Sequence, residues 1–386
     1  MRVVFSCVPQ AGHIMPMLPL AEALRAQGDE VVFASGDDTD AVVSARGFAC
    51  RRAGPAFAEW YAVLRSRIRG VPGDGLAPQR VERYFLPRLF GEVGTALMID
   101  DLVAVGRELA PDMLVFDPLV FAGPLAAAVL GVSGVQHTVG PLVDAEVSDL
   151  VADAVSPIWR EFGLDVPPAA GVYEGTTIAI CPASLDPAGA TLPRTQPLRP
   201  SPLPSRSGSD AIVLPAGDEP LVYITLGTFS NNPALFRILL DALADESIRM
   251  FVTTGTDVDP ATIRPIPANA TVERFVPQAR LLPHCAAAVH HAGAGTTFGI
   301  LAHGLPAVAL PQSADNFVIA QRLDAAGAAV TLMPSEVNAG AVRDALREVL
   351  TNGSYRIAAA QLAEEIAAMP GPEAVAAALR TPQPQV

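Results

Sequence analysis

Short apolar runs rich in β-branched residues alternate with longer Ala/Leu-rich segments along this chain. In its first half the runs lie at 3–8, 31–34, 113–116, 134–138 and 177–181. Helical patterns separate them, for example at 17–26 and 121–130. Runs that are continuously apolar, rather than alternating, are typical of strands buried on both faces of a parallel sheet. The pattern therefore predicts an α/β fold.

The alternation stops between residues 187 and 220, where eight prolines occur without apolar periodicity, and then resumes. The later runs lie at 221–225, 249–253, 271–274, 287–290 and 307–310, with helical patterns at 233–243, 295–303, 317–326 and 339–350. We expect two doubly wound, Rossmann-like parallel-sheet domains that face each other across a cleft. Their predicted bounds are 1–200 and 220–370, with a linker at 201–219 and a C-terminal helix or tail at 371–386.

Length and composition narrow the classes of function. A chain of 386 residues suits two domains. Its net charge is −14 and its 26 basic residues are all arginine, without basic runs, so neither a nucleic acid nor an anionic membrane is the expected partner. The four cysteines show no paired spacing, and no apolar stretch is long enough to span a bilayer. We expect a cytoplasmic protein that binds small molecules.

A glycine-rich segment at 290–297, HHAGAGTT, lies between a strand-like run and a helical pattern. Gly293 and Gly295 let the backbone approach a ligand closely, and a helix is expected to begin near Thr296. Its free N–H groups and positive dipole end favour an anion, most naturally a diphosphate, and His291 adds a side-chain donor. A turn that only packs strand against helix is the alternative. The segment is not the dinucleotide fingerprint, which should follow the first strand.

Two flanking segments complete a pattern for a nucleotide sugar. Phe275 and Val276, followed by a proline and Gln278, offer an aromatic ring and a fixed backbone edge to a nucleobase. Asp315 and Asn316 offer acceptors and donors to sugar hydroxyls. The three segments therefore cover the base, the diphosphate and the sugar in order.

Together, ERFVPQ at 273–278, HHAGAGTT, and LPQSADN ending at residue 316 resemble the donor-binding signature of family 1 glycosyltransferases of the GT-B fold. The likeness is strongest to bacterial enzymes that decorate macrolides and other polyketides. Gly12-His13 and Leu226-Gly227-Thr228 extend it over nearly the whole chain. The resemblance implies donor contacts from Thr228, Phe275, Val276, Gln278, His291, Gly293, Gly295, Thr296, Asp315 and Asn316. Two residues depart from the family pattern: Ala292 replaces a usual glycine, and Asn316 replaces a common glutamine.

His13 follows the first apolar run and is the candidate general base. A transferase needs a group that takes the proton of the acceptor hydroxyl, and imidazole suits this near neutral pH. Asp117 ends the run at 114–116, where the resembled family places an aspartate that supports the base. The alternatives are a structural histidine and an Asx turn before Pro118. Asp112 is expected to cap the start of the same strand.

The acceptor is expected to bind in the aromatic-rich region 55–90, for which Phe57, Trp60, Tyr61 and Phe85 are the named candidates. The alternative is that these rings belong to the core. Two Asp-x-Asp strings, at 38–40 and 257–259, are interpreted as solvated loop acids. We therefore expect neither a metal nor another cofactor, since the nucleotide sugar is a substrate.

The sequence thus predicts an inverting glycosyltransferase that moves a sugar from a nucleotide diphosphate, TDP in preference to UDP, to a small hydrophobic natural product. The alternatives are a non-catalytic partner protein that binds nucleotide sugars and another GT-B enzyme, such as a sugar-nucleotide epimerase. The sugar, the aglycone, the atom attacked and the formation of a homodimer stay open.

Overall fold

The chain folds as two units. The computed structural model describes residues 1–68, 83–143, 145–186, 192, 194–201, 212–227, 232–255, 258–313 and 315–380. Unit 1 comprises residues 1–203 together with 370–386, and unit 2 comprises residues 204–369. The division falls inside the predicted linker at 201–219.

Within the described residues, unit 1 contains one parallel sheet of seven strands in the order β3-β2-β1-β4-β5-β6-β7. The strands are β1 (Arg2–Ser6), β2 (Glu30–Ser35), β3 (Ala49–Arg52), β4 (Met113–Phe116), β5 (Ser133–His137), β6 (Thr176–Ala179) and β7 (Thr195–Pro197). The helices are α1 (Ala11–Ala26), α2 (Thr39–Ser44), α3 (Phe57–Arg67), the π-helix η1 (Leu86–Gly94), α5 (Thr95–Leu109), α6 (Ala122–Leu130), α7 (Ala145–Glu161), the short 3₁₀ turn η2 (Pro168–Gly171) and α15 (Pro372–Leu379). The sheet order reverses between β1 and β4, where ligands bind in doubly wound folds.

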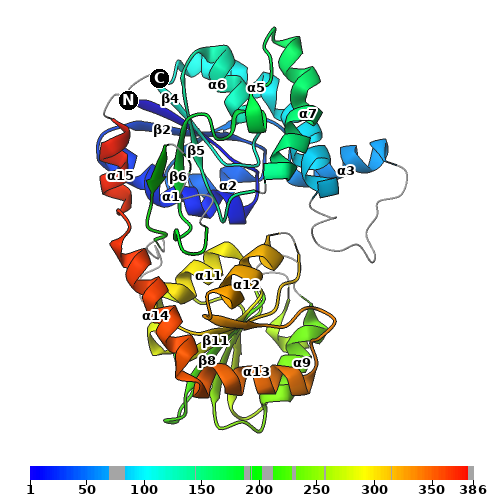
Figure 1. Ribbon diagram of the computed structural model, residues 1–386, viewed down its shortest axis with the longest axis vertical. Helices are drawn as coiled ribbons and strands as arrows, with labels where there is room; N and C mark the ends of the chain where they lie inside the picture. Colours follow the sequence, from blue (N-terminus) through cyan, green and yellow to red (C-terminus); the bar gives the residue numbers. More distant parts are fainter. Residues whose placement is uncertain are drawn as a thin grey trace. The chain divides into compact units, whose positions relative to one another are not determined.

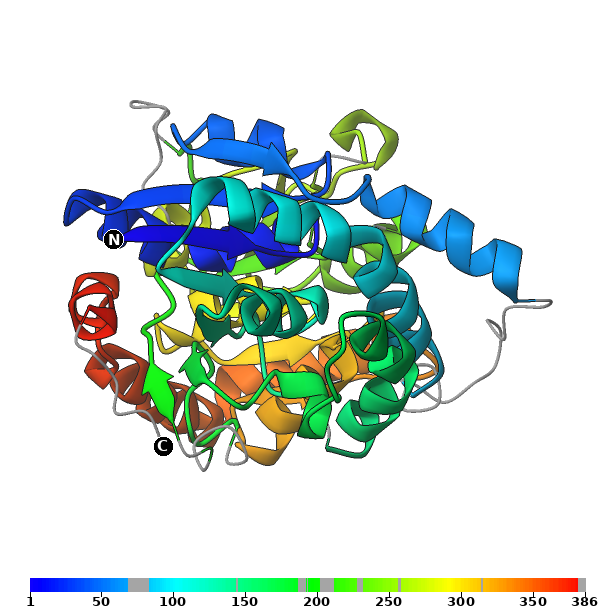
Figure 2. The ribbon, with the colours of Figure 1, turned by 90° about the horizontal axis from the view of Figure 1, so that it is seen from above.

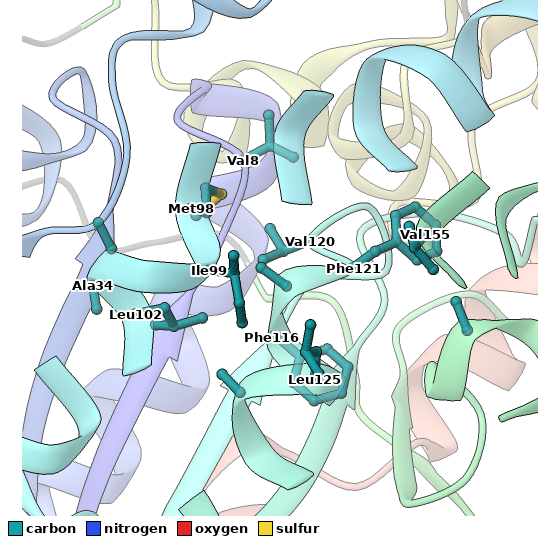
Figure 3. Close-up of a cluster of buried hydrophobic side chains, with 14 of the residues drawn as sticks. Val8, Ala34, Met98, Ile99, Leu102, Phe116, Val120, Phe121, Leu125 and Val155 are labelled. Carbon is teal, nitrogen blue, oxygen red and sulfur yellow. The ribbon is translucent and has the colours of Figure 1, made fainter. Parts of the chain in front are cut away.

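The main core cluster of unit 1 packs helices against one face of this sheet. Figure 3 shows side chains from the strands meeting Met98, Ile99 and Leu102 of α5 and Leu125 of α6. Phe116, the last residue of β4, is 2% exposed at the centre of this cluster. Each large apolar side chain buried here contributes about 1.5–3 kcal/mol. The end of β4 is therefore firmly held, and so is the residue that follows it.

The last helix returns to unit 1 after the chain has passed through unit 2. Helix α15 packs against α1 and lies beside the amino terminus in both views (Figure 1, Figure 2). Asp29, whose side chain is fully buried, forms an ion pair with the Arg380 guanidinium (2.7 Å) and accepts a hydrogen bond from its Nε (3.1 Å). The predicted C-terminal segment 371–386 thus contains a helix that is part of unit 1.

Within the described residues, unit 2 repeats the architecture with six parallel strands in the order β10-β9-β8-β11-β12-β13. The strands are β8 (Leu221–Thr225), β9 (Arg249–Thr253), β10 (Ala270–Glu273), β11 (Ala287–His290), β12 (Ala307–Ala309) and β13 (Ala329–Thr331). The helices are α9 (Pro233–Leu243), α10 (Gln278–Leu281), α11 (Ala294–Leu301), α12 (Asn316–Ala325), α13 (Ala339–Thr351) and α14 (Gly353–Ala368), with 3₁₀ turns η3 (Pro260–Thr262) and η4 (Leu282–His284). The prediction of two doubly wound parallel-sheet domains is confirmed.

Candidate functional site

Asp117 is a buried carboxylate at the carboxyl end of β4. It has no exposed surface, and its two oxygens accept hydrogen bonds from three N–H groups. Oδ2 accepts from the backbone N–H of Val8 (2.6 Å) and from Nδ1 of His13 (3.1 Å), while Oδ1 accepts from the N–H of Leu119 (2.7 Å). A buried charge is tolerated only with such partners. The predicted pairing of His13 with Asp117 is therefore present in the structure.

His13 lies in the first turn of α1, which begins before the helical pattern expected at 17–26. The helix begins at Ala11 and continues through Pro16 and Pro19. Prolines normally disfavour a helix interior, but Ile14, Met17 and Leu18 are buried and hold the first turns in place. The His13 side chain is 15% exposed. Because an ionised carboxylate only accepts hydrogen bonds, Nδ1 of His13 carries the proton and the basic lone pair lies on Nε2.

The neighbours of Asp117 in the sheet are polar but uncharged. One residue past the paired positions of β4, Asp117 lies level with Cys7, which follows β1, and with His137 at the end of β5. Burial raises the pKa of the Cys7 thiol, and the charge of Asp117 raises it further. Burial lowers the pKa of His137 to about 4, and its Nδ1 donates to the carbonyl of Thr138 (2.8 Å). Asp117 is therefore the one charged group in this row, and His13 is the imidazole that meets it.

The glycine-rich segment of unit 2 forms the loop between β11 and α11. We call residues 290–297 the diphosphate loop, after the ligand that the sequence predicts for it. Helix α11 begins at Ala294, two residues before the predicted start, with Gly293 as its N-cap residue. A Cβ atom at Gly295 would meet no other atom within 4 Å, so packing does not explain that glycine. A close approach by a ligand at the helix N-terminus would explain it.

His291 is held between two glycines. A Cβ atom at Gly227 would lie 2.5 Å from its Nε2, and one at Gly293 would lie 2.3 Å from the same atom. Gly227 also has a φ of +85°, so two independent reasons require glycine there. Burial lowers the pKa of His291 to about 4, and its Nδ1 has no hydrogen-bond partner in this structure. A neutral imidazole is therefore fixed at the N-terminus of α11.

Ala292, the departure from the family's glycine, takes a left-handed backbone conformation with a φ of +63°. Its N–H donates to Nδ1 of His290 (3.1 Å), which holds the backbone in this conformation. Since Nδ1 accepts, the His290 ring is neutral, and burial lowers its pKa to about 3. The methyl of Ala292 is fully buried. The loop therefore keeps the glycine-like geometry with an alanine.

Asn316 faces the interior of unit 2. It is 6% exposed, in the first turn of α12. With its amide nitrogen toward the diphosphate loop it donates to the carbonyls of Ser313 (3.1 Å) and His291 (3.3 Å), whereas the opposite orientation would point its oxygen at both carbonyls. Asp315 is exposed beside it. Asn316 thus connects α12 to the diphosphate loop by a hydrogen bond. The contact of Asp315 and Asn316 with sugar hydroxyls stays a prediction.

The segment predicted to hold the base places an exposed ring beside a buried backbone. The Phe275 side chain is 69% exposed, while Val276 is 9% exposed. The Gln278 amide nitrogen donates to Oγ1 of Thr296 (3.2 Å) in the diphosphate loop. This hydrogen bond therefore links the segment predicted to hold the nucleobase to the diphosphate loop. Thr228, the remaining predicted donor contact, lies outside the described residues.

The named acceptor candidates pack against one another. Phe57 lies 5.5 Å from Trp60 and 5.3 Å from Tyr61, measured between ring centroids. Trp60 has no exposed surface, and Gly94 packs onto its ring. Phe85 is half-buried and contacts Tyr84. These rings contribute to the core, and a role in acceptor binding stays a prediction.

Two contributors to the donor half escaped sequence reasoning. Gly227 had been noted only as part of a motif, and its contact with His291 depends on strand pairing between β8 and β11. Tyr223 looked like an ordinary apolar strand residue, yet its hydroxyl bonds Gln278 (3.3 Å) and Thr253 (2.8 Å). Its hydrogen bond to Thr253 depends on strand pairing between β8 and β9, which the sequence pattern does not show.

The described part of the chain contains neither a metal-binding cluster nor a membrane-spanning helix. No group of three or more His, Cys, Asp or Glu side chains there is arranged to hold a metal ion. Nor does that part contain a helix with the length and apolarity needed to cross a bilayer. Of the two Asp-x-Asp strings, Asp257 lies outside the described residues.

Comparison with known proteins identifies the family. The erythromycin biosynthesis protein CIII-like family matches the chain with its N-terminal domain at residues 79–196 and its C-terminal domain at 237–381. L-demethylnoviosyl transferase of Streptomyces niveus is 30% identical, over 99% of this chain and 98% of its own. The crystal structure of the glycosyltransferase SnogD from Streptomyces nogalater is 29% identical, covers 98% of each chain and superposes with a TM-score of 0.77.

A second solved structure carries a nucleotide. It is that of the glycosyltransferase SsfS6 from Streptomyces sp. SF2575, complexed with thymidine diphosphate. It is 26% identical, covers 99% of this chain and 100% of its own, and has a TM-score of 0.81. The two-unit fold superposes on both of these solved structures over nearly the whole chain. The chain therefore belongs to the erythromycin biosynthesis protein CIII-like family and is a GT-B glycosyltransferase of antibiotic and polyketide biosynthesis.

Proposed function

We propose that the protein transfers a sugar from a TDP-sugar to a hydroxyl group of a small hydrophobic natural product, with inversion and without a metal ion. The observation that carries this proposal is the hydrogen bond of 3.1 Å between His13 Nδ1 and Asp117 Oδ2. It leaves the basic lone pair on Nε2, the arrangement that a general base requires. The thymidine diphosphate bound to the related SsfS6 structure supports the choice of nucleotide.

In the proposed step, Nε2 of His13 takes the proton of the acceptor hydroxyl. The acceptor oxygen forms a bond to the anomeric carbon as the bond from that carbon to the diphosphate oxygen breaks, and TDP leaves with the electron pair. The carboxylate of Asp117 stabilises the imidazolium. One displacement inverts the anomeric centre, so an α-linked donor gives a β-glycoside.

The leaving diphosphate is assigned to the loop of unit 2. The N-terminus of α11 presents backbone N–H groups and the positive end of a helix dipole. Neutral His291 adds a hydrogen-bond donor, and Thr296 adds a hydroxyl. These groups can offset the charge of the diphosphate, which is why no metal ion is required in this proposal.

The test is glycosyl transfer by the wild type and by His13→Ala, with a TDP-sugar and a panel of hydrophobic acceptors. We expect kcat to fall by about 10²–10⁴-fold in the variant. His284→Ala removes an exposed imidazole from unit 2 and serves as the control, with unchanged kcat. A loss below tenfold in His13→Ala returns His13 to a structural role.

Two further measurements test the stereochemistry of the transfer and its independence of a metal ion. Proton NMR of the product reports the anomeric configuration, and retention refutes the single displacement. Transfer in the presence of EDTA should proceed at the untreated rate. Activity that EDTA abolishes and Mg²⁺ restores contradicts the metal-independent mechanism.

A further inference from the structure

A buried hydrogen-bond network lies beneath the predicted donor site of unit 2. The Tyr223 hydroxyl, near the middle of β8, lies 2.8 Å from Oγ1 of Thr253 on β9. The Gln278 amide nitrogen donates to this hydroxyl (3.3 Å) and to Oγ1 of Thr296 (3.2 Å). The network therefore connects the centre of the sheet with the first turn of α11.

The Gln278 amide nitrogen connects the two hydroxyl groups of this network. The Gln278 amide nitrogen carries two hydrogens, one for each hydroxyl oxygen. The Tyr223 oxygen accepts one of them and also shares a hydrogen bond with Oγ1 of Thr253, in which either oxygen can donate. The Thr296 oxygen accepts the other, so the Thr296 hydroxyl hydrogen must point elsewhere. An anion at the N-terminus of α11 is a natural acceptor for that hydrogen.

Packing holds the Gln278 side chain in this position. A Cβ atom at Gly299, one turn after Thr296 on α11, would lie 3.3 Å from the Gln278 amide oxygen. The amide therefore lies along α11 between Thr296 and Gly299, and any larger residue at 299 would crowd it. Tyr223 is 2% exposed, so its hydroxyl has no water to replace a lost partner.

We propose that Tyr223 is a positioning residue for the diphosphate, which it never touches. Through Gln278 its hydroxyl fixes the hydroxyl of Thr296 as a donor to the anion. The backbone of the Gln278 segment is the predicted contact of the nucleobase, so the same residue links the base end of the donor to the diphosphate end. The inference rests on the proposed function, which places the diphosphate beside Thr296.

Burial keeps the Tyr223 hydroxyl protonated, because it raises the pKa of this side chain above its ordinary value. The phenol therefore acts as a neutral hydrogen-bonding group in any ordinary assay buffer. Its removal in Tyr223→Phe leaves the ring in place and deletes only the hydroxyl. Tyr355→Phe makes the same change in the same unit, at the first turn of α14, and is the matched control.

The experiment measures dissociation constants of TDP by calorimetry and of thymidine by ligand-observed NMR. Tyr223→Phe should weaken TDP about three- to tenfold, the effect of one hydrogen bond, and should change thymidine less than about twofold. Thr253→Val removes the other partner of the same hydroxyl and should shift the two ligands in the same sense. Tyr355→Phe should change neither.

A double-mutant cycle tests whether Tyr223 acts through Thr296. If it does, adding Tyr223→Phe to Thr296→Val should weaken TDP by less than about twofold further. TDP binding that is unchanged in Tyr223→Phe, or thymidine weakened as much as TDP, overturns the positioning role while leaving the donor site intact. Wild-type protein that binds no TDP overturns the donor assignment itself, and this inference with it.

Discussion

Asp117→Asn is the substitution that most directly tests how the catalytic pair is built. The carboxylate accepts three hydrogen bonds, from Val8, Leu119 and His13. An asparagine offers one oxygen and one NH₂ group in the same space. If the oxygen faces Val8 and His13, the NH₂ group faces the N–H of Leu119. If it faces Leu119, the NH₂ group faces the N–H of Val8.

Either orientation therefore leaves one backbone N–H opposed by another donor in a site with no exposed surface. An unsatisfied buried N–H costs about 1–3 kcal/mol. We expect Asp117→Asn to lower the free energy of unfolding of unit 1 by about 2 kcal/mol. It also removes the charge that stabilises the imidazolium of His13, so kcat should fall with it.

Tryptophan fluorescence during urea unfolding measures this effect on unit 1 alone. The two tryptophans of the chain, Trp60 and Trp159, both lie in unit 1 and are buried. Asp112→Asn is the matched control, since Asp112 is exposed at the other end of β4 and accepts one bond, from the N–H of Arg2 (2.7 Å). Asp112→Asn should lower the free energy of unfolding by less than about 0.5 kcal/mol. Equal destabilisation by both variants would falsify the three-donor reasoning.

Two further predictions concern backbone strain and pH. Ala110 (φ +45°) and Ala292 (φ +63°) both have a left-handed backbone conformation. Ala110→Gly should raise the free energy of unfolding by about 0.5–1 kcal/mol, because the relief of strain exceeds the entropy that glycine adds to the unfolded chain. Ala292→Gly relieves the same strain but also loses a buried methyl group worth about 0.8 kcal/mol, so the free energy of unfolding measured in urea should change little. An equal gain in stability for the two variants would contradict this difference. Burial lowers the pKa values of His137, His290 and His291 to about 4, 3 and 4. Between pH 7 and pH 5 the unfolded chain gains protons at these histidines and the native protein does not. The free energy of unfolding should therefore fall by about 1–2 kcal/mol for each buried ring. Identical urea midpoints at the two pH values would refute this prediction.

Strand ends were the most predictable part of the site. The run at 113–116 coincides with β4, because its four residues are apolar and buried on both sides of a parallel sheet. Asp117 follows as the first polar residue, so its place at the carboxyl edge could be derived from the pattern. The same reasoning located β11 and the diphosphate loop, because glycines follow an apolar run there.

The start of α1 was less predictable for a physical reason. Pro16 and Pro19 oppose a helix locally, and only the burial of neighbouring side chains against the rest of unit 1 overrides them. A single sequence does not show that compensation. Helix α15 is a similar case, because its return to unit 1 depends on Arg380 meeting buried Asp29, a residue 351 positions away.

The orientation of Asn316 shows a different limit. Its residue type and its place in LPQSADN predict donors and acceptors for sugar hydroxyls, without an orientation of the amide. In the structure the amide is oriented by two backbone carbonyls, from Ser313 and His291. Motif spacing predicts which residues gather at a site, whereas backbone conformation decides which way each side chain points.

The two histidines of the proposed mechanism differ in what surrounds them, and this difference matches the chemistry of the two ends of the reaction. His13 is paired with a buried carboxylate, which fixes the tautomer with its lone pair on Nε2 and stabilises the imidazolium of the proposed step. His291 is packed between Gly227 and Gly293, and burial lowers its pKa to about 4, so it stays neutral. A neutral ring can donate a hydrogen bond to a departing diphosphate but does not hold a proton for it. Exchange of the two environments would place a neutral, weakly basic ring in unit 1 and the carboxylate beside the ring in unit 2, so the placement of a single carboxylate, Asp117, assigns the role of base in this mechanism to His13.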